Sequence, residues 1–368
     1  MRWIFADDLT GAMEVAVIGP EPTLVAWQPG SLGSRQSVVV NLATRDLDCS
    51  RLDDSMARWG EIGEEAKATD VGQKMDSLGR GHWPHETRWL AEHFNRSRVL
   101  VAPSLPAEER SVKEGWIWYR KQKVLDLRQS LASVGLSVAS FTEEGSLPKD
   151  LGTSVTVFVA DASTDEDLRH LVRTWPFEAR ESLFVGSRGL LSAWISPTPG
   201  GREIPNVDGP ILVIIGSLHA ERLGQLSALK TVLPIWSLSE LARGAQLPCG
   251  QDGVVTSVDM EADGPGVIQA YWQSVLPKVL RRGWGALLVS GGATAEVVLA
   301  SAQAGSVEAL AALPEGSALG RINGGMLHGT LIATKSGSFG TESALAALYN
   351  GLVSRRNEDT ENGAKTRN

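Results

Sequence analysis

Short apolar runs alternate with amphipathic stretches along the first half of the chain. The apolar runs are Val38–Val40, Arg98–Val101, Val155–Val159 and Leu183–Val185. Between them the spacing of apolar residues predicts helices at about residues 50–67, 84–95, 123–133, 164–174 and 187–195. Strands that alternate with helices are typical of βαβ units, so we expect a largely parallel sheet in this half.

A segment rich in proline and glycine interrupts the pattern at residues 196–210, and we interpret it as an interdomain linker. Beyond it the alternation resumes, with strands expected at 211–215, 253–258 and 286–289 and helices at 219–230 and 264–282. The predicted fold class is α/β: two α/β domains with mainly parallel sheets and a ligand cleft between them. The domains are expected at residues 1–195 and 211–350, and residues 351–368 are expected to form a disordered tail.

Length, charge and cysteine content narrow the class of protein. A chain of 368 residues is long enough for about two domains. Its net charge of −8, without a long basic run, argues against a nucleic-acid partner. Cys49 and Cys249 have no metal-ligand spacing, and we find neither a signal peptide nor an apolar run that could span a bilayer. We expect a cytoplasmic protein with a small-molecule partner and no membrane partner; a homodimer is compatible with these features.

The first residues carry the clearest chemical signal. An apolar run at residues 2–6 ends in Asp7 and Asp8 and passes directly into a predicted helix. Ligands of open α/β sheets bind beyond the carboxyl ends of strands, which favours a functional interpretation. The alternative is that one of the two acids only caps the helix, but a cap needs one carboxylate and not two.

Three further segments of the first half, 44–46, 74–81 and 102–106, follow strand-like runs and could meet Asp7 and Asp8 at one sheet edge. These segments and the N-terminal residues supply three kinds of polar group. The cations are Arg45, Lys74 and Arg80, the carboxylates are Asp7, Asp8 and Asp76, and Ser77 adds a hydroxyl. Guanidinium groups bind carboxylates and carboxylates accept from hydroxyls, so this set suits a sugar acid. Ordinary surface ion pairs are the alternative interpretation.

Glycine-rich turns recur in the second half of the chain. Gly216–Ser217, Ser290–Thr294 and Lys335–Gly340 each follow an apolar run and precede a predicted helix. Such turns expose backbone N–H groups at a helix N-terminus, where phosphate oxygens bind favourably. We therefore predict a nucleotide site, although each glycine alone could merely relieve a tight turn.

Taken in order, these motifs resemble those of the four-carbon acid sugar kinases. The matching segments span residues 4–340 and are Ala6–Ala12, Lys74–Gly81, Ala102–Pro103 with Pro106 and Arg110, Asp161–Ala162, Gly186–Ser187, Gly216–Ser217, Gly291–Ala295 and Lys335–Gly340. The resemblance implies ATP-dependent phosphorylation of a terminal hydroxyl on a sugar acid of about four carbons, such as threonate, erythronate or a 3-oxo-tetronate. It also implies a substrate-binding N-terminal domain and an ATP-binding C-terminal domain.

Roles can be assigned on these positions. The expected ATP contacts are Ser217, Gly291, Gly292, Ala293, Thr294, Lys335 and Gly337. In our hypothesis Arg45 and Arg80 hold the substrate carboxylate, with Asp7 and Ser77 beside them, and Lys74 neutralises developing charge. Either Asp8 or Asp76 accepts the proton of the attacking hydroxyl, and this choice stays open. Mg²⁺ would bridge the ATP phosphates, and no metal-ligating cluster of side chains is expected.

Two rival interpretations remain at this level. Ala293 replaces an acid that is usual in the family, and His219 stands where a serine is frequent, so a non-catalytic nucleotide or sugar-acid sensor is one alternative. A phosphatase of the haloacid dehalogenase type is the other. Its Asp-x-Asp-x-Thr pattern is not matched here, because Leu9 occupies the position of the second aspartate.

Overall fold

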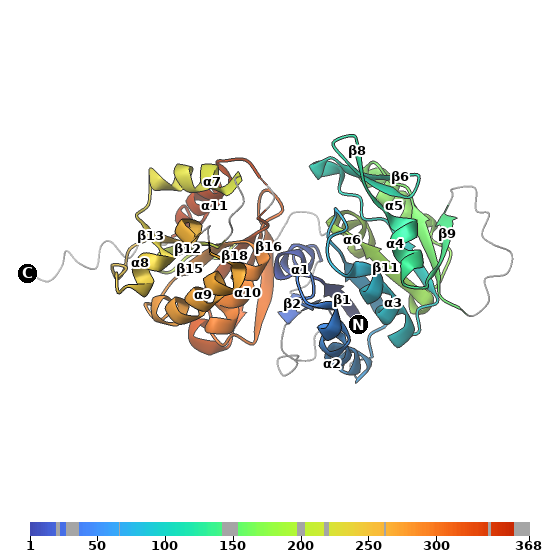
Figure 1. Cartoon of the computed structure of the whole chain (residues 1–368), viewed down its shortest axis with the longest axis horizontal. Helices are drawn as coiled ribbons and strands as arrows, with labels where there is room; N and C mark the ends of the chain where they lie inside the picture. The colour runs from blue at the N-terminus through green and yellow to red at the C-terminus, as the bar shows by residue number, and fades with distance from the viewer. Residues whose placement is uncertain are drawn as a thin grey trace, which may run out of the picture. The chain divides into compact units, whose positions relative to one another are not determined.

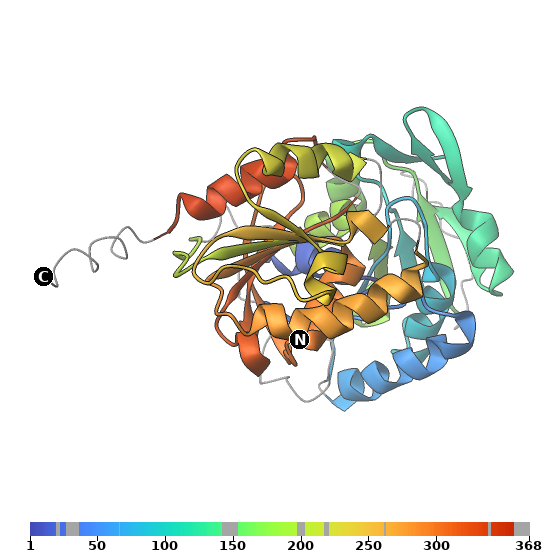
Figure 2. The same cartoon turned by 60° about the vertical axis from the view of Figure 1, so that its left-hand side comes forward.

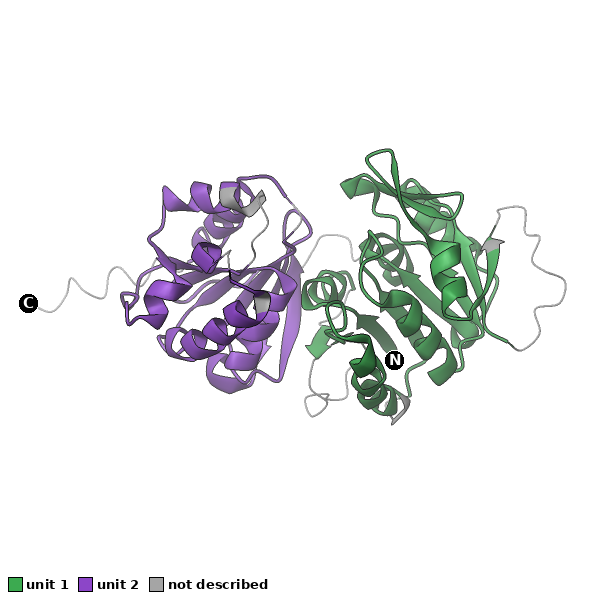
Figure 3. Ribbon diagram, in the orientation of Figure 1, with its two compact units in different colours: residues 1–199 green, residues 200–368 purple. Residues whose placement is uncertain are grey.

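The computed structural model describes residues 1–19, 23–26, 37–65, 67–141, 154–196, 203–216, 221–260, 263–337 and 340–356. The chain divides into two compact units, Met1–Pro199 (unit 1) and Gly200–Asn368 (unit 2), which Figure 3 colours separately. Each unit contains a sheet with helices packed on it, which confirms the predicted α/β class. No helix among the described residues combines the length and the apolar character needed to cross a membrane.

The main sheet of unit 1 is parallel throughout its described strands (Figure 1). In chain order these are β1 Arg2–Ala6, β2 Thr23–Ala26, β3 Ser37–Asn41, β4 Asp70–Lys74, β5 Arg98–Val101, β9 Ser137–Phe141, β10 Thr156–Ala160 and β11 Ser182–Gly186. Their order across the sheet is β2-β3-β1-β4-β11-β5-β10-β9. The apolar runs recognised in the sequence thus form strands, as expected for runs that are buried on both faces.

Helices cover both faces of this sheet. They are α1 Leu9–Ala16, α2 Leu52–Glu65, α3 Trp83–His93, α4 Leu127–Ser133, α5 Asp165–Thr174 and α6 Arg188–Ile195. One core joins alternate strand residues such as Trp3 and Phe5 to Trp59 of α2 and Leu90 of α3, because successive strand side chains point to opposite faces. Contacts among α1, α5 and α6 place these helices together on the other face.

A small antiparallel sheet follows β5 in unit 1, and the sequence did not predict it. Its strands are β6 Arg110–Lys113, β7 Trp116–Tyr119 and β8 Gln122–Asp126, in the order β6-β7-β8. The predicted helix at 123–133 is therefore wrong over its first residues, because β8 pairs with β7 and α4 begins only at Leu127. Asp126 caps α4 by accepting from the N–H of Gln129.

Unit 2 has a second, mostly parallel sheet. Its strands are β12 Ile211–Ile215, β13 Ile235–Ser237, β14 Gly253–Thr256, β15 Ala286–Ser290, β16 Ser306–Ala312, β17 Ala318–Asn323 and β18 Leu331–Lys335, in the order β13-β14-β12-β15-β18-β17-β16. β17 is antiparallel to both β16 and β18. The helices are α7 Glu221–Lys230, α8 Leu238–Ala242, α9 Pro265–Leu280, α10 Gly292–Ser301 and α11 Ala344–Val353. Figure 2 shows α7 and α11 above the strands and α9 below them.

The two ends of unit 2 are tied together. Val207, in the segment expected to be a linker, bridges Arg356 and donates its N–H to the carbonyl of Arg355 at 2.9 Å. Arg356 also pairs with Asp252 at 2.8 Å, and the Tyr349 hydroxyl donates to the same carboxylate at 2.6 Å. The prediction of a disordered tail is therefore wrong for residues 351–356. The first three of them belong to α11, and Arg355 and Arg356 make the contacts just described. Residues 197–202 of the expected linker and 357–368 of the expected tail lie outside the described residues.

Candidate functional site

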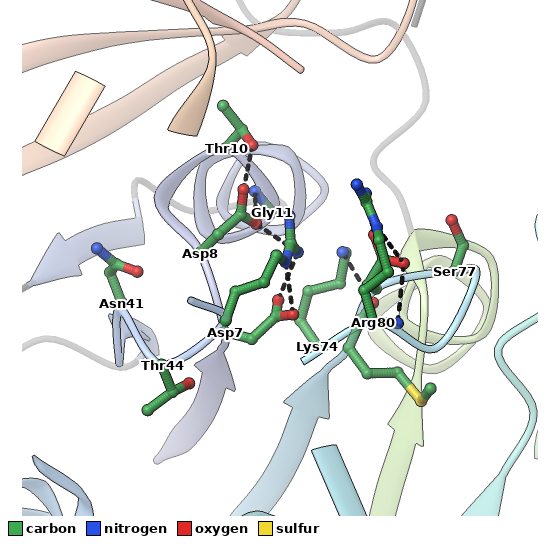
Figure 4. A network of polar contacts seen from close by, with 12 residues as sticks. Asp7, Asp8, Thr10, Gly11, Asn41, Thr44, Lys74, Ser77 and Arg80 are labelled. Atoms are coloured by element: carbon green, nitrogen blue, oxygen red, sulfur yellow. Dashed lines mark hydrogen bonds and ion pairs between the residues drawn. The ribbon is translucent and has the colours of Figure 1, made fainter. Parts of the chain in front are cut away.

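The carboxyl ends of three neighbouring strands bring the predicted site residues of unit 1 together. Ala6 at the end of β1 is in register with Asn41 of β3 on one side and Lys74 of β4 on the other. The segments that leave these strands carry Asp7 and Asp8, Thr44 and Arg45, and Asp76 to Arg80. Figure 4 shows the resulting cluster, which we call the carboxylate cluster and define as Asp7, Asp8, Arg45, Lys74, Asp76, Ser77 and Arg80.

Asp8 is both a helix cap and a member of this cluster. Its Oδ1 accepts from the N–H of Gly11 at 2.9 Å, and its Oδ2 accepts from the Thr10 hydroxyl at 2.6 Å. The extended backbone of Asp8 places it as the N-cap of α1. Asp8 is therefore the acid that caps the helix, and Asp7 is not needed for this role.

Arg45 joins the two carboxylates. Its Nε and Nη2 donate to the two oxygens of Asp7 at 2.9 and 2.7 Å, and Nη2 also donates to Oδ1 of Asp8 at 2.9 Å. Burial raises the pKa of Asp7, and the adjacent Arg45 guanidinium opposes this shift. The pKa of Arg45 lies above its ordinary value, because the charges of Asp8 and Asp7 outweigh the effect of burial.

Asp76 and Arg80 form a second ion pair in the loop after β4. Arg80 donates from Nε and Nη2 to the two oxygens of Asp76 at 3.0 and 2.6 Å, and the N–H of Leu78 donates to Oδ1 at 3.0 Å. Burial alone would raise the pKa of Asp76. The Arg80 hydrogen bonds and the nearby charges of Arg45, Arg80 and Lys74 nevertheless hold it well below its usual range. Asp76 is therefore a weak proton acceptor.

Lys74 lies between Asp7 and Arg80 (Figure 4). It is buried, and its Nζ donates to the carbonyl of Met75 at 3.1 Å. A Cβ added to Gly11 would come within 2.7 Å of Asp8 Oδ1 and 3.0 Å of Lys74 Nζ. The absence of a side chain at Gly11 therefore allows Asp8 and Lys74 to approach each other.

The segment 102–106 reaches the carboxylate cluster only indirectly. It follows β5, which is separated from β4 by β11 in the sheet. Arg110, a little further along the chain, is buried and its Nη1 donates to the Ser77 hydroxyl. This contact connects the small antiparallel sheet to the loop after β4.

Sequence reasoning missed a buried polar network directly behind the cluster. Glu86 of α3 is fully buried, accepts from the Thr44 hydroxyl at 2.5 Å and accepts from the side-chain amide of Gln73 at 3.0 Å. Burial, together with the charge of Asp7, raises the pKa of Glu86 to about 7. Glu14 of α1 was also missed, and burial raises its pKa to about 7 against the charges of Lys74 and Arg188. Neither residue follows a strand, so no positional signal in the sequence could have identified them.

In unit 2 the described parts of the three glycine-rich turns leave adjacent strands. Ile215 at the end of β12 is in register with Ser290 of β15, which is in register with Lys335 of β18. A Cβ on Gly216 would lie 2.2 Å from Thr294 Oγ1, so the turn after β12 packs directly on the start of α10. Ser217 and His219 lie outside the described residues, as do Ser338 and Phe339.

The start of α10 has features that favour the binding of a phosphate group. Gly291 is its N-cap, with φ of 105° and no side-chain cap, which leaves the backbone N–H groups of Gly292, Ala293 and Thr294 at an uncapped helix N-terminus. The buried hydroxyls of Ser290 and Thr334 have no hydrogen-bond partner among the residues that the structure describes. Lys335 is fully buried and its Nζ donates to the carbonyl of Ser336 at 3.0 Å, while Gly337 continues this turn. The described residues contain no group of three or more His, Cys, Asp or Glu side chains that could hold a metal ion.

Comparisons with known proteins also separate a sugar-binding part of the chain from a nucleotide-binding part. Residues 3–133 match the model of a sugar-binding N-terminal domain, and residues 253–345 match that of a nucleotide-binding C-terminal domain. A D-threonate kinase of Bordetella bronchiseptica is 24% identical over 96% of this chain and 98% of its own length. A D-threonate kinase of Cupriavidus necator is 26% identical over 97% and 99%. The solved structure of a Haemophilus influenzae protein of the DUF1537 family has the same fold, with a TM-score of 0.68 at 15% identity over 95% of this chain and 100% of that one.

A sugar-binding α/β domain followed by a nucleotide-binding α/β domain is the organisation of a sugar phosphotransferase. The chain belongs to the four-carbon acid sugar kinase family, as its motifs predicted. This membership confirms the expected enzyme class, a sugar-acid kinase.

Proposed function

We propose that this protein is an ATP-dependent kinase that phosphorylates a terminal hydroxyl of a sugar acid of about four carbons, with threonate, erythronate and 3-oxo-tetronate as the candidate substrates. The carboxylate cluster carries this proposal, because it combines three carboxylates with three cations at the ligand-binding edge of a domain of the sugar-binding type. The two D-threonate kinases, which align over nearly their full length, support threonate as the first substrate to test.

The contacts within the carboxylate cluster support separate roles for its residues. Substrate binding would draw Arg80, whose side chain is half exposed, from Asp76 towards the substrate carboxylate. Arg45 is held by Asp7 and Asp8, so it would mainly fix the orientation of these two acids. We assign Asp8 as the group that accepts the hydroxyl proton, because its Oδ1 lies near Lys74 Nζ, the cation assigned to the transferred phosphoryl group. Lys74 would neutralise charge on the transferred phosphoryl group.

Unit 2 would bind ATP through the start of α10 and the turns beside it. Gly291 to Thr294 would hold phosphate oxygens through backbone N–H groups, with Ser217, Lys335 and Gly337 in the flanking turns. Mg²⁺ would arrive with the nucleotide and reduce the charge of its phosphates. Transfer requires that the bound sugar acid and the bound nucleotide meet in the working enzyme.

A coupled assay of ADP release tests the proposal. We expect turnover with ATP, Mg²⁺ and one of the stereoisomers of threonate or erythronate, and none with the corresponding uncharged polyols. ATP binding without ADP release across the whole panel would instead favour the sensor function, for which Ala293 at the start of α10 is the specific observation. Release of phosphate from phosphorylated sugar acids without nucleotide would favour a phosphatase.

A further inference from the structure

The small antiparallel sheet of unit 1 borders a hollow with a basic lining. Its volume is about 230 Å³, and the residues that line it include Glu109, Arg110, Lys113, Trp118, Arg120 and Lys121. Four of these side chains are cations, whereas Glu109 is the one carboxylate among them and pairs with Arg120 at 3.3 Å. The lining therefore carries a clear excess of positive charge.

The turn between β7 and β8 places two of these cations at positions that disfavour them. Arg120 and Lys121 have φ of 45° and 65°, so both central residues of this hairpin turn are left-handed. Turns of this kind prefer Asn-Gly, because residues other than Gly and Asn are strained in the left-handed conformation. The neighbouring turn between β6 and β7 has Glu114 and Gly115, with the expected glycine in second place. Residues that violate a local rule are expected where their side chains serve a function.

Arg110 links the hollow to the carboxylate cluster. It lines the hollow, it is buried, and it donates to the Ser77 hydroxyl in the loop after β4. Its guanidinium lies 5.5 Å from the ring centre of Tyr119, and that of Arg120 lies 5.1 Å from the same ring. The ring of Tyr119 thus helps to position two of the four cations.

We propose that this hollow binds a small anion that carries a phosphate group. Arginine and lysine side chains together suit a group with several charged oxygens, and Ser111 and Ser163 supply hydroxyls. The volume lies below the range of about 300 to 1,000 Å³ that is usual for drug-sized ligands, which fits a small metabolite. The hollow belongs to unit 1, whereas the glycine-rich turns belong to unit 2, and the proposal does not depend on the kinase activity.

Trp118 provides a local probe, because its indole Nε1 donates to the carbonyl of Lys113 at 3.3 Å in the wall of the hollow. We would label the tryptophans with ¹⁵N and assign the Trp118 indole signal by its loss in Trp118→Phe. Titration with inorganic phosphate and with 3-phosphoglycerate should shift this signal to saturation. Glycerate, which lacks the phosphate group, should bind at least about tenfold more weakly. Tighter binding of inorganic phosphate would identify free phosphate as the ligand. Tighter binding of 3-phosphoglycerate would identify a phosphate ester.

The double variant Arg120→Asn with Lys121→Gly tests the role of the turn. It restores the residues that the turn prefers and removes two charges, so it should raise the Tm and weaken phosphate binding at least about tenfold. Lys67→Gly is the matched control, because Lys67 is also exposed and left-handed, with φ of 55°, and does not line the hollow. It should leave phosphate binding unchanged.

Three results would overturn the proposal: no shift of the Trp118 signal at millimolar phosphate compound, wild-type binding by the double variant, or glycerate binding as tight as that of 3-phosphoglycerate. If the double variant fails to fold, Lys121→Gln alone must still weaken binding several-fold. Because the indole signal is read without turnover, a failed kinase assay and a failed binding titration remain distinguishable.

Discussion

At the scale of single residues, the site depends on a close approach between Asp8 and Lys74 that Gly11 permits. Gly11→Ala places a methyl group 2.7 Å from Asp8 Oδ1 and 3.0 Å from Lys74 Nζ, so both side chains must move. We expect kcat/KM to fall by about tenfold or more, because small misplacements of catalytic groups are costly. Alanine favours helix, but moving Asp8 Oδ1 weakens its N-cap bond to the N–H of residue 11, so we expect a modest fall in Tm.

The control for this substitution is Gly266→Ala in α9, where an added Cβ meets no atom within 4 Å. It should retain full activity in the same ADP-release assay. Wild-type kinetics for Gly11→Ala would show that the spacing of Asp8 and Lys74 is not critical.

The two candidate bases can be separated by their kinetic effects. Asp8→Asn should lower kcat by about 10² to 10⁴-fold, as expected for loss of a general base. Asp76→Asn should mainly raise KM for the sugar acid, because Arg80 loses the partner that positions it. Exposed Asp48, which caps its own turn, gives the control variant Asp48→Asn. The assignment of Asp8 is wrong if Asp76→Asn shows the larger loss of kcat.

At the scale of elements, helix α3 supports the site through Glu86. This carboxyl connects the Thr44 hydroxyl, in the loop after β3, to the Gln73 amide of β4, so one helix fixes two of the segments that carry the carboxylate cluster. Its pKa of about 7 lies above the ordinary value of 4.5. The folded state therefore binds the carboxyl proton of Glu86 more tightly than the unfolded state does. The stability that this protonated carboxyl contributes is lost as pH rises from about 4.5 to about 7.

Glu86→Gln should remove this part of the pH dependence. A shift of this size corresponds to roughly 3 kcal/mol, so the free energy of unfolding should fall less between pH 5 and 8 in the variant than in the wild type. Urea unfolding at several pH values measures it. Glu14 has its own pKa of about 7, so part of the dependence of unfolding free energy on pH should remain in both proteins. Glu92→Gln, on the exposed side of α3, should keep the wild-type slope, and an equal slope for Glu86→Gln would contradict the role of Glu86.

The turn after β12 offers a matching test in unit 2. Gly216→Ala would place a Cβ 2.2 Å from Thr294 Oγ1 and displace the start of α10. We expect KM for ATP to rise by about tenfold, with a smaller effect on KM for the sugar acid. Gly351→Ala in α11 is the control, because an added Cβ there meets no atom within 4 Å. An unchanged KM for ATP in Gly216→Ala would argue against a nucleotide contact at this turn.

The sequence predicted the parallel strands well, because runs such as Ile211–Ile215 are apolar on both faces. It missed β8, whose residues Gln122–Asp126 include good helix formers and become a strand only by pairing with β7. The members of the carboxylate cluster could be predicted because they follow strands. Glu86 could not, since a glutamate in a helix is usually exposed and its burial here depends on tertiary packing.

At the scale of the whole molecule, the proposed reaction predicts domain closure. Phosphoryl transfer needs the sugar acid and the nucleotide in line and shielded from water, so binding of both ligands together is expected to make the molecule more compact. Small-angle scattering should show a smaller radius of gyration with a non-hydrolysable ATP analogue and sugar acid together than with either alone. Gly216→Ala should show less compaction at the same nucleotide concentration. A radius that does not change with both ligands would contradict closure.

The tie between Val207 and Arg356 has a practical consequence for dissecting the protein. Expression of the nucleotide-binding half by itself should begin near residue 203 and end at or after Arg356. Cutting at 211 and 350 would delete the short bridge and leave the Asp252 carboxylate without its guanidinium partner. For the same reason, joining a fusion partner directly after Val353 should reduce yield, whereas one attached beyond residue 356 should be tolerated.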